Sequence, residues 1–103
     1  MRILGEPIIV RFVRKHADAG QWLENWLLVA RTADWRTIQD VRATYAAADG
    51  GVRVASGAKV TVFDISGNKY RMIVDIVYVI QTHTVLEIMT HAEYSKGLWK
   101  RRY

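Results

Sequence analysis

The stretch that decides the fold runs from Gly67 to Tyr94 and reads GNKYRMIVDIVYVIQTHTVLEIMTHAEY. Two runs rich in β-branched and aromatic residues follow a turn at residues 66–68, which predicts a β-hairpin. Cations stand at the start of the hairpin, and a histidine and a tyrosine stand at its finish. Its open end therefore gathers hydrogen-bond donors suited to a phosphate, and we interpret it as a candidate site for cutting RNA.

Alternation sorts the two faces of this hairpin. The face expected to pack on helices holds Tyr70, Met72, Val74, Ile76, Tyr78 and Ile80 of a strand from Lys69 to Ile80, with Leu86 and Ile88 of the next strand. The open face holds Lys69, Arg71, Ile73 and Asp75, with Val85, Glu87, Met89 and His91. Antiparallel pairing then places His91 opposite Arg71 or Ile73, so Arg71 and His91 become neighbours. His83 is expected in the hairpin loop.

Helical signals fill the first half of the chain, after a short edge strand at residues 1–4. Apolar residues recur at helical spacing after Pro7, with basic residues on the other side. The β-branched residues of this segment leave a strand open as the alternative. The apolar stripe over residues 19–31 predicts a second helix, and we interpret its Trp22 and Trp26 as core.

Local signals mark the ends of these elements. Asp18 followed by Gln21 predicts a capped helix start. Thr37 is expected to cap a shorter helix that holds Val41 and Tyr45. Glycines within residues 49–57 predict a flexible connection, after which a strand leads into the hairpin.

Composition limits the class of protein. At 103 residues, half of them hydrophobic, the chain is expected to form one domain, residues 1–103, with a single core. A formal net charge of +5 and a sequence pI of about 9.8 fit a polyanion or an acidic partner. The absence of cysteine excludes disulfides and thiol catalysis and fits a reducing cytoplasm. Charged residues interrupt every apolar run, so we expect neither a signal peptide nor a membrane span.

Two short strings of the hairpin resemble a known family. Gly67-Asn68-Lys69-Tyr70-Arg71 and Thr90-His91-Ala92-Glu93-Tyr94 are similar to the HigB branch of the RelE-like toxins, small bacterial mRNA interferases that a paired antitoxin holds in check. The resemblance implies an α+β, RelE-like fold, in which two or three N-terminal helices pack on one face of a small, mainly antiparallel β-sheet. It also implies cleavage of mRNA on the translating ribosome, contacts to ribosomal RNA, a HigA-like antitoxin partner and a cytoplasmic location.

The chemistry of RNA assigns a role to each residue type in these strings. The 2′-hydroxyl attacks the adjacent phosphorus in line, so an enzyme has to orient the strand, stabilise charge and move protons. Arg71 is expected to hold phosphate oxygens, His91 to exchange a proton, and Tyr94 to stack on a base or supply its hydroxyl. The residues expected to bind RNA are Lys59, Asn68 and Lys69. The three histidines lack metal-ligand spacing, so neither a metal nor a cofactor is assigned.

Other interpretations of the same residues stay open. The cations also suit the solvated face of a sheet, and His91 and Tyr94 also suit its capped end. The chain departs from the family pattern at three positions, Val60, Asp64 and Ser95, where a basic residue, an asparagine and an acid are expected. Lys59 is placed to replace the missing charge. The alternative functions are a non-catalytic RNA-binding module and a toxin of the same fold that acts on a protein such as gyrase.

Overall fold

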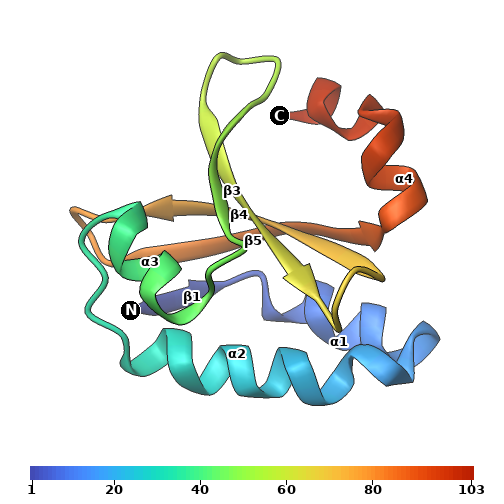
Figure 1. Cartoon of the computed structure of the whole chain (residues 1–103), viewed down its shortest axis with the longest axis horizontal. Helices are drawn as coiled ribbons and strands as arrows, with labels where there is room; N and C mark the ends of the chain where they lie inside the picture. Colours follow the sequence, from blue (N-terminus) through green and yellow to red (C-terminus); the bar gives the residue numbers. More distant parts are fainter.

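The computed structural model describes every residue from Met1 to Tyr103 and is an α+β structure (Figure 1). Its strands are β1 (Arg2–Leu4), β2 (Asp49–Arg53), β3 (Lys59–Ile65), β4 (Tyr70–Val77) and β5 (Thr82–Thr90). Its helices are α1 (Glu6–Lys15), α2 (Gly20–Thr32), α3 (Ile38–Thr44) and α4 (His91–Lys96), with the 3₁₀ helices η1 (Ala17–Ala19) and η2 (Leu98–Arg102). The predicted edge strand, N-terminal helices and hairpin are confirmed. None of the helices is long and apolar enough to cross a membrane.

The five strands form one open sheet in the order β1-β5-β4-β3-β2. Only β1 and β5 run parallel, so the predicted mainly antiparallel sheet is confirmed. Gly5 turns the chain from β1 into α1 with a φ of 87°, and a Cβ there would lie 2.5 Å from the carbonyl oxygen of Val85. Only glycine tolerates both the positive φ and this close approach.

Helices α1 and α2 pack on one face of the sheet, the lower face in Figure 1. The apolar stripe of α2 buries Leu23, Trp26 and Ala30 completely, and the Trp26 ring meets Phe63 of β3 edge to face at 5.6 Å. The interpretation of Trp26 as core is therefore confirmed. Trp22 is only partly buried, and it packs against Tyr45, with ring centroids 5.5 Å apart.

The predicted cap of α2 is wrong. Ala19 occupies the N-cap position, and no side chain caps this helix. Asp18 instead accepts hydrogen bonds from the Lys69 ammonium at 3.1 Å and from the Tyr70 hydroxyl at 2.8 Å. A charged donor and a phenol from the sheet therefore compete for the carboxylate that local sequence assigns to the helix. Thr37 does occupy the N-cap of α3, but its side chain makes no capping hydrogen bond.

The prediction of a flexible connection at residues 49–57 is wrong for its first half. Residues 49–53 form strand β2, which pairs with β3, and only residues 54–58 form a turn. Gly50 lies under α3, since a Cβ there would come within 2.7 Å of Ile38. The turn is fastened to the C-terminal segment, because the Ala55 N–H donates to the Lys100 carbonyl at 2.9 Å.

A β-bulge changes the side-chain order on β5. Ile73 pairs with Glu87 and Val74 pairs with Val85, so Leu86 has no partner on β4. Val85 consequently enters the core under the helices, and Leu86 packs on the opposite face. The prediction that Leu86 shares the helix-covered face is wrong, because alternation assumes an uninterrupted register and one extra residue reverses it.

The β4–β5 loop also differs from the prediction. β4 ends at Val77 rather than at Ile80, whose side chain is largely exposed. His83 is not in the loop: it lies fully buried in β5, with its ring 5.5 Å from Trp26 and 5.4 Å from Trp35. The turn is held by Gln81, whose side-chain amide donates to the Trp35 carbonyl at 2.7 Å.

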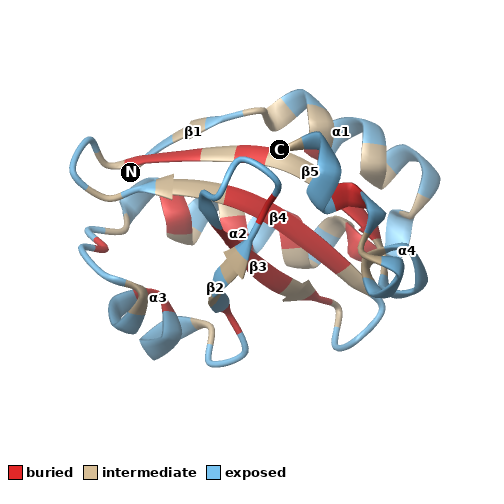
Figure 2. Cartoon of the chain, turned by 90° about the horizontal axis from the view of Figure 1, so that it is seen from above, coloured by how far each residue is buried: buried red, intermediate tan, exposed pale blue.

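The face of the sheet expected to be open is partly covered. The segment α4–η2 lies on the side opposite α1 and α2 (Figure 1). The fully buried Trp99 of η2 packs there with a second apolar cluster: Val54, Val60, Val62, Ile73 and Met89. Buried residues therefore dominate the middle of the sheet, as the red segments of β3 to β5 show in Figure 2. The C-terminal residue closes this layer, since the Tyr103 hydroxyl donates to Glu87 at 2.8 Å.

Candidate functional site

Arg71 lies at the centre of the candidate site. It pairs across the strands with Asp64, and its Nε lies 3.1 Å from Asp64 Oδ1. One terminal nitrogen donates to the Tyr70 carbonyl at 3.1 Å, and the other donates to the side-chain carbonyl oxygen of Asn68. Arg71 is only 7% exposed. The guanidinium is therefore held in one orientation by groups on both strands and in the turn.

Tyr94 of α4 covers this guanidinium. The central carbon of the Arg71 guanidinium lies 5.6 Å from the Tyr94 ring centroid, within the range of a cation–π contact. The same ring stacks on Trp99, with ring centroids 5.5 Å apart, and the Trp99 indole N–H donates to the Tyr94 carbonyl at 3.2 Å. The arginine, the tyrosine and the tryptophan thus form one packed stack.

The Tyr94 hydroxyl remains protonated at neutral pH. Burial raises the pKa of Tyr94, the carboxylates of Asp49 and Asp64 raise it further, and only the Arg71 charge opposes them. A phenol in this state donates a hydrogen bond and does not act as a base.

His91 occupies a different position from the predicted one. Met89, and not His91, lies opposite Arg71, and the ladder ends where Tyr70 pairs with Thr90. Thr90 ends the strand because it caps α4: its hydroxyl oxygen accepts the Glu93 N–H at 3.2 Å. His91 is therefore the exposed first residue of α4, at the same end of the sheet as Arg71 but beyond the last strand pair.

Lys69 is not on the face of Arg71. It belongs to the β3–β4 turn, and its ammonium pairs with Asp18 on the helix side of the sheet. The same carboxylate accepts the hydroxyl of Tyr70, whose ring packs against Phe12 at 5.1 Å. These hydrogen bonds, from Tyr70 first and Lys69 second, lower the pKa of Asp18. The predicted grouping of Lys69 with Arg71 is wrong, because a tertiary carboxylate draws the ammonium away.

Lys59 lies at the opposite end of β3 from Asp64. It lines a cavity of about 540 Å³ together with Arg42 of α3 and the segment leading into β2. Of the three residues predicted to bind RNA, only Asn68 touches Arg71. Nothing in the contacts brings Lys59 or Lys69 to the arginine.

Sequence reasoning missed two members of this site, Asp64 and Trp99. The hairpin turn at residues 66–69 pairs Asp64 with Arg71, so a count of residues from the turn was a signal that could have found the ion pair. Trp99 carried no such signal, because it lies outside every periodic segment and is buried only by tertiary packing.

Two further observations bear on what the site can do. No group of three or more histidine, cysteine, aspartate or glutamate side chains is placed to hold a metal ion.

A cavity of about 200 Å³ adjoins the stack and is lined by Met89, Glu93, Lys96, Leu98, Trp99 and Arg102. Two cations, Lys96 of α4 and the Glu87-paired Arg102 of η2, therefore line the cavity beside the stack, where a phosphate backbone could be held.

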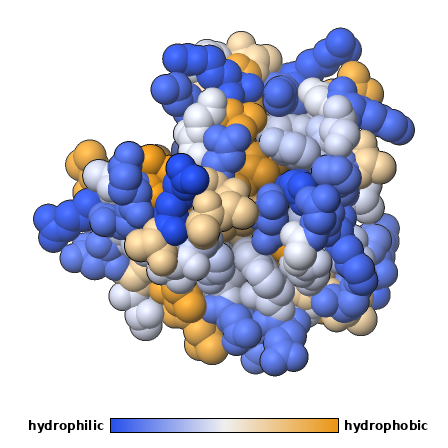
Figure 3. All heavy atoms as spheres, in the orientation of Figure 1, coloured by the Kyte–Doolittle hydropathy of each residue, from blue (hydrophilic) through white to orange (hydrophobic).

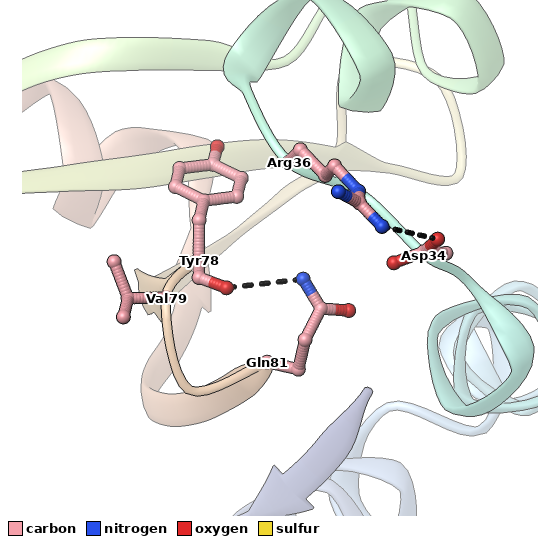
Figure 4. Close-up of a pocket in the computed structure, with 5 residues that line it drawn as sticks. All are labelled: Asp34, Arg36, Tyr78, Val79 and Gln81. Carbon is pink, nitrogen blue, oxygen red and sulfur yellow. Dashed lines mark hydrogen bonds and ion pairs between the residues drawn. The ribbon is translucent and has the colours of Figure 1, made fainter.

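A polar cavity of about 390 Å³ lies at the other end of the hairpin, beside the β4–β5 loop (Figure 4). Asp34 and Arg36 line it and pair with each other at 3.4 Å, and both side chains are mostly exposed. Tyr78, Val79 and Gln81 complete the wall. On the face seen in Figure 3, hydrophilic residues cover most of the surface and apolar residues lie in small groups. The charged side chains of this cavity are exposed, whereas Arg71 is buried and held in one orientation. The Arg71 stack is therefore the better candidate for a catalytic site.

The chain matches the model of one protein family, HigB_toxin, described as the RelE-like toxic component of a toxin-antitoxin system. The match covers residues 19–97, which include the Arg71 stack up to Tyr94 and all the residues predicted to bind RNA or to be catalytic. The resemblance stated from the sequence is therefore confirmed. No curated protein matches the chain.

Proposed function

Because this chain belongs to the HigB family of RelE-like toxins, and is thus the toxic component of a toxin–antitoxin system, we propose that it is an mRNA endoribonuclease. In this proposal it cuts mRNA on the translating ribosome, in the cytoplasm, and so inhibits translation. A HigA-like antitoxin restrains it, and residues 1–103 form a single toxin domain. The observation that carries the proposal is the oriented guanidinium of Arg71 beneath the Tyr94 ring.

Arg71 supplies stabilisation of negative charge. When the 2′-hydroxyl attacks the adjacent phosphorus, charge builds up on the phosphorane-like transition state. Each terminal nitrogen of Arg71 makes one hydrogen bond within the protein, so one N–H on each remains for a ligand. Two such donors in one plane match two phosphate oxygens. The chemistry needs no metal, because the nucleophile belongs to the substrate.

His91 and Tyr94 supply the proton transfers and the orientation. His91 is exposed at the start of α4, where its imidazole is accessible to a bound strand and is the group assigned to proton transfer. Tyr94 keeps its proton, so its hydroxyl donates a hydrogen bond to a reacting oxygen while its ring holds Arg71. The other expected contacts to RNA are Lys59, Asn68 and Lys69. Asn68 acts through Arg71, and the two lysines bind the backbone away from the reacting phosphate.

Mapping of mRNA 5′ ends after a brief induction of the toxin tests this function. New ends should accumulate within translated regions, and single-turnover cleavage on programmed ribosomes should yield a 2′,3′-cyclic phosphate or its 3′-phosphate hydrolysis product. Arg36→Ala is the matched control for Arg71→Ala in this assay, because Arg36 is an exposed arginine at the other end of the hairpin. DNA damage without cleaved mRNA would point to a target such as gyrase, and binding of RNA without cleavage would point to a non-catalytic module.

A further inference from the structure

Asp64 is the nearest anion to the guanidinium that the proposed function depends on. It sits directly opposite Arg71 in the β3–β4 ladder, and the Nε–Oδ1 distance is 3.1 Å. The arginine side chain is 9% exposed, whereas the aspartate side chain is 33% exposed. The carboxylate therefore offsets the charge of Arg71 at short range, in a place where water screens it only in part.

Charges of both signs lie near the stack, and two of the cations, Lys96 beside Trp99 and Lys100 over the Trp99 ring, have no ion-pair partner. Asp49 adds a second carboxylate that acts on Tyr94. Lys69 is paired with Asp18 on the far side of the sheet, and Arg102 is paired with Glu87 at 3.2 Å. A basic chain with a net charge of +5 thus places its one buried arginine directly against a carboxylate.

We propose that Asp64 is a positioning residue that also restrains Arg71. Its carboxylate fixes the Nε side of the guanidinium against β3, and its negative charge weakens the binding of a phosphodiester to the two free N–H groups. This inference rests on the proposed function for its consequence, because a restrained Arg71 means a slower nuclease. The binding of a phosphate to Arg71 is measured without any cleavage.

Asp64→Asn separates the two effects. The asparagine has the same shape as the aspartate and keeps an oxygen close to the Arg71 Nε, and the other two hydrogen bonds of the guanidinium are untouched, so the charge is removed with little change in orientation. A phosphate held by the terminal nitrogens would lie about 6 Å from the carboxylate, and Coulomb repulsion over that distance, reduced by partial solvent exposure, corresponds to a binding change on the order of 10-fold. Asp34→Asn is the matched control, because it makes the same change in net charge far from the stack.

The first measurement uses the free protein and two probes. One is inorganic phosphate, and the other is a short RNA that carries a 2′-deoxynucleotide at the cleavage position, so that it cannot be cut there. The NMR signal of the Arg71 Nε–H reports binding at this side chain. We expect Asp64→Asn to bind both probes about 10-fold more tightly than the wild type, with Asp34→Asn unchanged. Equal or weaker binding by a folded Asp64→Asn would overturn the proposal.

A double-mutant cycle shows whether the gain passes through Arg71. In an Arg71→Gln background, which keeps a polar side chain at the site, Asp64→Asn should give no gain in the affinity for the short RNA. A gain of the same size in that background would overturn the proposal, because the effect would then be one of general charge.

Cleavage on programmed ribosomes separates this inference from the proposed function. At subsaturating ribosomes Asp64→Asn should raise the single-turnover rate by about 10-fold, whereas Asp64→Ala, which also removes the side-chain oxygen that packs against Arg71, should gain less. If neither the wild type nor any variant cleaves RNA, but Asp64→Asn still binds the probes more tightly, the nuclease proposal fails and the role of Asp64 stands. If the wild type cleaves and Asp64→Asn gains neither affinity nor rate, the role of Asp64 fails and the nuclease proposal stands.

Discussion

Replacement of Trp99 tests whether the C-terminal segment holds the candidate site together. Trp99 is 1% exposed, stacks on Tyr94 and packs with the apolar cluster on the second face of the sheet. Trp99→Ala removes a large buried ring and should cost about 3 to 5 kcal/mol of unfolding free energy. For a domain of this size, a loss of that order lowers the unfolding midpoint by roughly 12 °C or more.

Matched variants separate the contributions of ring packing and of the indole hydrogen bond to the stability that Trp99 provides. Trp99→Phe keeps a ring against Tyr94 and loses the hydrogen bond from the indole N–H, so it should cost only about 1 to 2 kcal/mol. Leu98→Ala changes a neighbouring residue that is 54% exposed, and it should change stability by less than about 0.5 kcal/mol.

Denaturant unfolding followed by circular dichroism measures these differences, and the Arg71 Nε–H signal measures the state of the site. The Arg71 signal should broaden or shift in Trp99→Ala, because Tyr94 loses its support. A Trp99→Ala protein as stable as Leu98→Ala would refute the reasoning, since η2 would then contribute nothing to the covered face.

Four further outcomes are expected. Arg71→Ala should lower single-turnover cleavage on the order of 100-fold while antitoxin binding is retained, and His91→Ala should lower it about 100- to 10,000-fold; full activity in the folded double variant would contradict the site. Tyr94→Phe should keep ribosome binding and slow cleavage, and an unchanged rate would limit Tyr94 to holding Arg71. Burial and the nearby N-terminal amine lower the pKa of His83 to about 4, so the folded state binds fewer protons than the unfolded state. Stability should therefore fall by up to about 3 kcal/mol between pH 6.5 and 4, and an equal loss in His83→Phe would exclude this histidine as the cause. Binding to ribosomes should weaken with salt by a log–log slope of about 0.7 to 0.9 per phosphate contact, and a flat response would exclude nucleic acid.

The sequence by itself determined the class of fold and the hairpin. The period-2 pattern from Tyr70 onward and the turn at residues 66–68 are local signals, and local signals suffice where a strand buries one face. The same strings identified the family and named Arg71 and Tyr94, which the structure brings into contact. The roles of these residues in cleavage stay predictions.

Tertiary structure decided which face some residues occupy and which polar groups pair, and an alternating pattern in the sequence cannot predict either. The bulge at Leu86 exchanges two side chains between the faces of β5, because a strand's own period says nothing about an extra residue in its pairing. Competition for polar partners decided Asp18, which bonds to Lys69 and Tyr70 instead of capping α2. Each of these outcomes depends on a residue far along the chain.

The site shows the same division. The sequence placed cations on an open face, whereas the folded chain covers that face with Trp99 and leaves Arg71 paired with Asp64. Residues 97–103 have no periodicity of their own, so only the apolar surface of the sheet determines where they lie. Net charge is a sum over the whole chain, but the charge that a phosphate meets is set by the few groups within a Debye length of it, and only the fold selects those groups.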